Sequence, residues 1–216
     1  MVQASEPLNE IKIFGGAISV PLPSRLQDVS DFRPVPDHQE IFTDAARDQS
    51  LIVEVVVRAS GSGMVGVHQA GHHSPPTAHA HCPAQEFQDQ PDEDAAGFFF
   101  KDLADVGQAV SSRLDSVQGL GSRDVPHLPP SLYVSLAAGQ HTVAKSGAAS
   151  EALAIQVLLA DIRIPAHGSD LLISLHTRSS SLGAQESETE APLQGPELFK
   201  SILKGLKILD WGLFGQ

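Results

Sequence analysis

The sequence has little of several features that mark particular classes of protein. It contains one cysteine, Cys82, in 216 residues, so no disulfide can form within the chain. Small secreted domains that depend on disulfides are therefore excluded. No run of about 18 apolar residues occurs, so we expect no membrane-spanning helix. Basic residues are also few, and the formal net charge of −12 disfavours nucleic acid or anionic lipid as the main partner.

Two kinds of signal are missing as well. The first ten residues, MVQASEPLNE, have no basic region before an apolar stretch, so they resemble neither a secretory signal nor a transit peptide. The chain has no G-x-S-x-G and no H-E-x-x-H motif, so neither an esterase-type nucleophile nor a zinc protease is indicated. We expect residues 1–10 to be a tail, and residues 11–216 to form a single domain with a low-complexity insertion at 59–91.

The insertion is rich in Gly, Ser, Pro, Ala and His, and such a composition predicts a flexible segment. Residues 61–66, GSGMVG, match the dinucleotide fingerprint G-x-G-x-x-G, but Pro75 and Pro76 oppose the helix that this motif requires. Imidazole and thiolate groups bind zinc or copper, although a site needs fixed spacing on ordered elements. A His-rich metal-binding protein is thus an alternative whose weak candidate ligands are His68, His72, His73, His79, His81 and Cys82.

The remaining pattern predicts an antiparallel sheet with helices packed against it, an α+β fold. A helix is expected from Asp92 through Val106 with its apolar residues toward the core, and another from Pro196 with an apolar stripe reaching Leu209. Residues 139–146, GQHTVAKS, miss the phosphate-binding loop by one glycine and precede another strand, so we reject that reading. The strand candidates are 11–14, 17–20, 39–43, 50–58, 132–136, 142–144 after a turn at Gly139, 153–164 (with a bulge near 160–161) and 171–176.

Several stretches of the sequence form a specific pattern: FGGAI (14–18), PLP (21–23), DVS (28–30), RPVPDHQE (33–40), DQSLIVE (48–54), AAGFFF (95–100), DL (102–103), VAK (143–145), 158–165, SDLLI (169–173) and LFG (213–215). In these stretches the chain resembles the Ran guanine nucleotide release factors, the Mog-one family, which share a fold with the photosystem II protein PsbP. The similarity spans nearly the whole chain outside the insertion. It implies a twisted antiparallel sheet sandwiched by α-helices.

The resemblance implies a protein that binds the small GTPase Ran and promotes nucleotide release, without a cofactor or catalytic group of its own. It also implies a role in nuclear import of proteins and a location in the nucleus and the cytoplasm. We expect the protein to be a monomer. In the family an acidic surface meets the partner: Glu54 matches its first carboxylate, and Val57 stands where the second would be. Asp37, Glu40 and Asp102 are the other candidate contacts. A PsbP-like extrinsic photosynthetic subunit is the remaining alternative.

Overall fold

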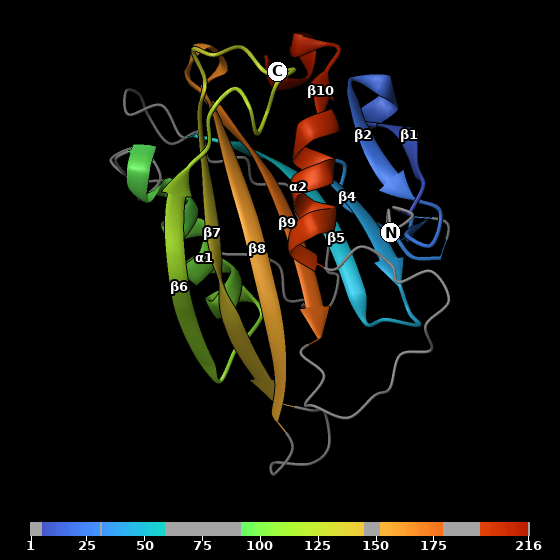
Figure 1. The fold of residues 1–216 in the computed structure, drawn as a ribbon, viewed down its shortest axis with the longest axis vertical. Helices are drawn as coiled ribbons and strands as arrows, with labels where there is room; N and C mark the ends of the chain where they lie inside the picture. Colours follow the sequence, from blue (N-terminus) through green and yellow to red (C-terminus); the bar gives the residue numbers. More distant parts are fainter. Residues whose placement is uncertain (1–5, 31, 59–91, 145–151, 179–194, 216) are drawn as a thin grey trace, which may run out of the picture.

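The computed structural model describes residues 6–30, 32–58, 92–144, 152–178 and 195–215. In this part of the chain, a seven-stranded antiparallel sheet has the order β3-β4-β5-β9-β8-β7-β6, and a smaller sheet has the order β1-β2-β10. Helices lie on both faces of the large sheet (Figure 1). The predicted α+β sandwich is confirmed.

The strands are β1 (Leu8–Ile13), β2 (Ile18–Pro23), β3 (Gln27–Asp28), β4 (Gln39–Asp44), β5 (Gln49–Val57), β6 (Ser111–Gly119), β7 (Tyr133–Ala144), β8 (Ala152–Ile164), β9 (Ser169–Arg178) and β10 (Lys207–Ile208). The helices are α1 (Ala95–Val106) and α2 (Gly195–Gly205). Short 3-10 turns occupy Phe14–Gly16, Asp92–Asp94, Pro165–His167 and Trp211–Phe214.

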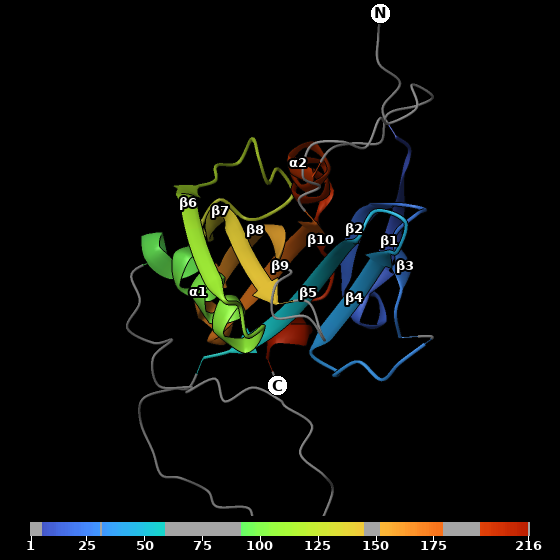
Figure 2. The same ribbon diagram turned by 90° about the horizontal axis from the view of Figure 1, so that it is seen from below.

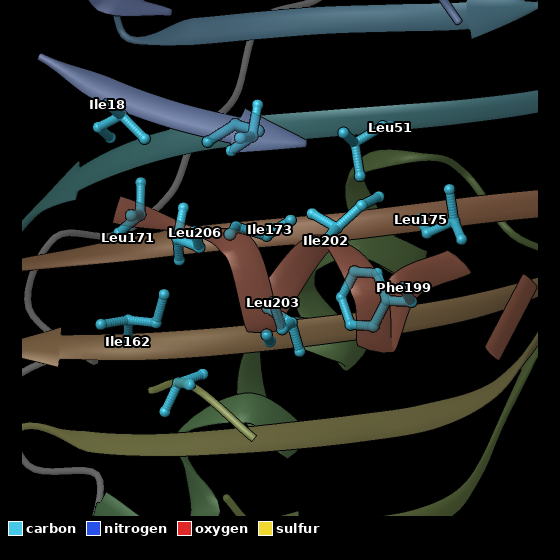
Figure 3. Packing of buried hydrophobic residues seen from close by; sticks show 14 of the residues in the cluster. Ile18, Leu51, Ile162, Leu171, Ile173, Leu175, Phe199, Ile202, Leu203 and Leu206 are labelled. Atoms are coloured by element: carbon cyan, nitrogen blue, oxygen red, sulfur yellow. The ribbon is translucent and has the colours of Figure 1, made fainter. Parts of the chain in front are cut away.

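Helix α2 covers one face of the large sheet with a continuous apolar core. Its buried side chains recur at positions that share one side of a helix, and they pack against alternate residues of β5, β9 and β8 (Figure 3). The stripe ends earlier than predicted, because the helix stops at Gly205 and the chain turns into β10, which pairs with β2. The α2 side chains in this core are Leu198, Phe199, Ile202 and Leu203.

Helix α1 covers the opposite face (Figure 2). Ala96, Phe99 and Phe100 pack there against buried residues of β7 and β8. Gly139 allows the close approach, since a Cβ atom at this position would lie 2.2 Å from the Arg113 carbonyl oxygen and 2.5 Å from Phe100 Cζ. The close approach of β6 and α1 thus accounts for this glycine of the stretch that resembles a phosphate loop. The turn predicted at Gly139 is wrong, because β7 runs through this residue without a break.

Three details differ from the predictions made on sequence. Strand β1 begins at Leu8, inside the segment expected to be a tail. Strand β8 keeps a continuous register with β7 and β9, so the bulge predicted near residues 160–161 is wrong. The change of parity arises because residues 157–164 are buried on both faces of the sheet. The shift in register lies instead in β6, between Leu114 and Ser116.

Candidate functional site

A groove of about 560 Å³ lies between β5 and α1. Most of its lining is apolar, which is typical of sites that bind ligands or partner side chains. Glu54 lines the strand side and Asp102 the helix side, so the structure brings these two predicted residues to one site. The apolar lining residues of the groove are Ile52, Val55, Val56, Val57, Phe99, Leu103, Val106, Leu159 and Leu172.

Strand parity explains why Glu54 faces this groove. Side chains alternate between the two faces of a strand, and Leu51 and Val53 belong to the core beneath α2. Ile52, Glu54 and Val56 therefore point to the α1 face. The Glu54 side chain is 24% exposed, so its carboxylate reaches solvent from an apolar surround.

His38 lies at the edge of the groove, in the turn before β4. Its Nε2 atom is 3.6 Å from Glu54 Oε1. The turn is held over β5 because the Val55 amide donates a hydrogen bond to the His38 carbonyl oxygen at 2.9 Å. Sequence reasoning did not single out His38, since its contact with Glu54 depends on how β4 pairs with β5.

The other two predicted contacts have different surroundings. Asp37 is exposed and precedes His38, outside the lining of the groove. Glu40 is the register partner of Val53, which places it on the α2 face, away from Glu54. Its carboxylate accepts a hydrogen bond from the Phe14 amide at 2.7 Å. Phe14 has a φ of +50°, a strained value for a residue with a side chain, so Glu40 stabilises the turn between β1 and β2.

Further along the α1 face, the buried side chains of Asp161, Arg163 and Asp170 form a charged group with Arg58 and the exposed Asp92. Arg58 Nε lies 3.1 Å from Asp170 Oδ1, and Arg163 Nη1 lies 2.6 Å from Asp92 Oδ1. Burial, together with the nearby Asp170 carboxylate, raises the pKa of Asp161 well above its usual range. Arg163 and Asp170 are register partners, and Arg58 and Asp92 flank residues 59–91. The residues on either side of that segment, Arg58 and Asp92, are thus bound at neighbouring positions of the sheet.

The candidate metal ligands His68, His72, His73, His79, His81 and Cys82, and the motif at 61–66, lie outside the described residues. Among the residues that are described, no group of three or more His, Cys, Asp or Glu side chains is arranged to hold a metal ion. No helix in the same part of the chain is long and apolar enough to cross a membrane.

Sequence reasoning also assigned Val106 to the core. It lies at the end of α1 with 53% of its surface exposed, at the mouth of the groove. The spacing of apolar residues predicted which side of α1 faces the sheet, but it did not predict the residue at which that side stops contacting the sheet. No local sequence signal marks the end of this contact, because the contact depends on how α1 packs against a strand about forty residues earlier in the chain.

Comparisons with known proteins agree with the fold and its sequence pattern. A family model described as Ran-interacting Mog1 protein matches residues 11–178. The Ran guanine nucleotide release factors of Bos taurus and Homo sapiens are each 30% identical to the chain over 216 residues, covering 97% of it and 98% of the relative. The crystal structure of the Ran-binding protein Mog1p from Saccharomyces cerevisiae superposes with a TM-score of 0.59 at 18% identity, covering 97% and 100% of the two chains.

The yeast structure shows that the fold is shared. The family model and the bovine and human relatives show that the amino-acid sequence is similar as well. The model matches well over half of the chain, and the relatives are matched over almost their whole length. On this evidence, the chain belongs to the family of Ran-interacting Mog1 proteins, the Ran guanine nucleotide release factors.

Proposed function

We propose that this protein binds Ran and promotes the release of its guanine nucleotide, in support of nucleocytoplasmic transport in the nucleus and cytoplasm. The relatives that match nearly the whole chain carry the name Ran guanine nucleotide release factor. The observation that carries the site is the position of Glu54, a carboxylate on the wall of an open, mainly apolar groove.

The proposed activity follows from linkage between two binding events. A protein that binds nucleotide-free Ran more tightly than nucleotide-loaded Ran must weaken nucleotide binding by the same factor. Such a protein needs no catalytic group, and one monomer is sufficient. Its residues need only bind nucleotide-free Ran more tightly than nucleotide-loaded Ran.

Electrostatics favours a basic partner surface at the groove. The net charge of −12 raises the rate of encounter with a positively charged surface. We assign the main contact to Glu54, with Asp102 on the facing wall and exposed Asp37 beside the groove. Glu40 lies on the opposite face and has a structural partner, so we do not place it in this contact.

Release of a fluorescent GDP analogue from preloaded Ran, chased with excess unlabelled GDP, tests the function. We expect the wild-type protein to accelerate release. Glu54→Lys places a like charge against the basic partner surface, and we expect it to lower the affinity for Ran by about tenfold or more. Glu197→Lys is the matched control, because Glu197 is an exposed acid in the first turn of α2, on the other face of the sheet.

A wild-type protein that left the release rate unchanged would contradict the proposed function. A wild-type protein that accelerated release equally well with Glu54→Lys would contradict the site while leaving the function intact. Thermal unfolding of both variants controls for loss of the fold.

A further inference from the structure

Of the described residues that line the groove, His38 alone has a side chain that can carry a positive charge. The other ionisable side chains in the lining are the carboxylates of Glu54 on β5 and Asp102 on α1. Asp37, the exposed residue before His38, adds a further carboxylate to the same turn. The net charge at the groove therefore depends on whether the His38 imidazole holds a proton.

The backbone places His38 beside Glu54, independently of either side chain. The residue after His38 is Gln39, the register partner of Glu54 in the pairing of β4 with β5. The His38 carbonyl oxygen accepts a hydrogen bond from the Val55 amide at 2.9 Å. The Gln39 amide closes the turn by donating to the Pro36 carbonyl oxygen at 2.9 Å. Because these bonds use main-chain atoms, we expect the turn to stay in place when the His38 side chain is replaced.

The two side chains are close enough to form an ion pair. The His38 Nε2 atom is 3.6 Å from Glu54 Oε1, and a protonated imidazole at this distance attracts a carboxylate. The His38 side chain is 57% exposed, so protons from solvent reach the ring. A neutral ring carries no net charge, so the ion pair exists only while His38 is protonated.

We propose that His38 makes the binding of Ran depend on pH, because its protonated ring competes with the partner's cation for Glu54. The protonated imidazole pairs with the Glu54 carboxylate and repels a lysine or arginine that approaches it. The neutral imidazole leaves the carboxylate to the partner. This inference rests on the proposed function, since the competing cation belongs to Ran.

Linkage fixes the direction of the effect. A partner cation at Glu54 disfavours a second positive charge on His38, so the binding of Ran and the protonation of His38 oppose each other. Histidine is the side chain whose charge ordinarily changes between about pH 5 and 8, so affinity for Ran should rise with pH in this range. Burial lowers the pKa of His176, on the same face of the sheet, to about 4. That histidine therefore stays neutral where His38 is tested.

The test compares the dissociation constants of wild-type protein and His38→Gln for nucleotide-free Ran, from roughly pH 6 to pH 8 at constant ionic strength. Glutamine keeps a polar side chain but cannot be protonated. We expect the ratio of the wild-type constant to that of the variant to rise about threefold as the pH falls across this range, the size that an exposed ion pair allows. Titrating groups of Ran affect both proteins alike and cancel in the ratio.

Two further variants separate pairing with Glu54 from other effects of charge. In a protein that carries Glu54→Gln, His38→Gln should no longer change the dependence on pH. His127→Gln is the matched control, because His127 is an exposed histidine between β6 and β7 that does not line the groove. It should keep the wild-type pH profile. Thermal unfolding at both ends of the pH range checks that each variant is folded.

The proposal is overturned if wild-type protein and His38→Gln bind Ran with parallel pH profiles. It is also overturned if the ratio falls at low pH, if His127→Gln changes the profile as much as His38→Gln does, or if the effect of His38→Gln persists beside Glu54→Gln. In these cases the proposed function stands without a role for His38 in it. Wild-type protein that neither binds Ran nor releases its nucleotide at any pH overturns the function and this inference together.

Discussion

The two faces of the seven-stranded sheet carry different kinds of structure. Beneath α2, Phe199 and Ile202 close over buried residues of β5 and β9 in a continuous apolar core (Figure 3). Beneath α1, the cover is incomplete, and buried charges and an open groove lie beside a smaller apolar cluster. The α2 face thus mainly stabilises the fold, and the α1 face is the one to which we assign the proposed contact with a partner.

The two acidic residues that sequence reasoning treated alike illustrate this division. Glu40 and Glu54 lie on neighbouring strands, yet they point to opposite faces. Glu40 is bound to the Phe14 amide, while Glu54 lines the groove. A substitution on the α2 face should therefore change stability, and one on the α1 face should change binding.

The largest effect is expected for Phe199→Ala. Phe199 is buried on the α2 face, and removal of a buried phenylalanine ring leaves a cavity that costs about 3–5 kcal/mol in the free energy of unfolding. Urea denaturation measures this loss. Below the unfolding transition, the remaining folded protein should still accelerate release of nucleotide from Ran. A loss of release that exceeds the unfolded fraction would break the division between the faces.

Glu40→Ala is expected to have a smaller effect on stability. Loss of a hydrogen bond to a charged acceptor costs about 1.5–3 kcal/mol, and here it also removes support from the strained Phe14. Glu54→Ala serves as the comparison and should leave the unfolding free energy nearly unchanged while weakening binding to Ran. A reversed result, with Glu40 controlling binding and Glu54 controlling stability, would contradict the assignment of the two faces.

The dependence of stability on pH should report the polar groups on the α1 face. Burial, with a smaller effect of nearby His141, lowers the pKa of His176 from 6.5 to about 4. Protons then bind the unfolded state more readily between these values, so stability falls as the pH drops from 6.5 towards 4. The loss should be about 1 kcal/mol, because His176 is only half-buried and solvent reduces the difference.

Urea titrations across this range compare the wild-type protein with His176→Gln, which cannot be protonated. The variant should lose less stability at acid pH. Identical pH profiles for the two proteins would exclude His176 as a source of the dependence.

The smallest effect is expected for Val57→Glu, which adds an exposed carboxylate at the end of β5, on the border of the groove. An exposed charge at the edge of an interface acts mainly on the association rate. We expect faster association with Ran at low salt and a steeper decrease as salt increases, by stopped-flow fluorescence. An unchanged salt dependence would place Val57 outside the contact.

Sequence patterns predicted the elements that bury an apolar face. A nearly continuous run rich in Val and Ile predicted β5 in residues 50–58, and Pro196 with Glu197 marked the start of α2. For residues 108–130, which contain β6, the pattern did not decide between helix and extended chain. Strand β6, SSRLDSVQG, is an edge strand with mostly exposed side chains and so has little apolar alternation. Glu40 lies on the α2 face and Glu54 on the α1 face. This difference depends on the register in which β4 pairs with β5, and a local sequence pattern does not specify that register.

The groove itself was also beyond sequence reasoning. Glu54 and Asp102 became candidates through resemblance to a family, and only the docking of α1 against the sheet brings them to one site. The apolar walls were read as core, since apolar spacing alone does not distinguish a covered face from an open one.

The most direct test of the account is a methyl NMR spectrum of the protein with and without nucleotide-free Ran. Isoleucine and valine methyl groups report both faces, with Ile52, Val57 and Val106 at the groove and Ile202 beneath α2. The account predicts that Ran shifts or broadens the signals of the groove methyls and leaves that of Ile202 in place. Changes gathered around α2 and the β1-β2-β10 sheet, with the groove signals unchanged, would contradict it.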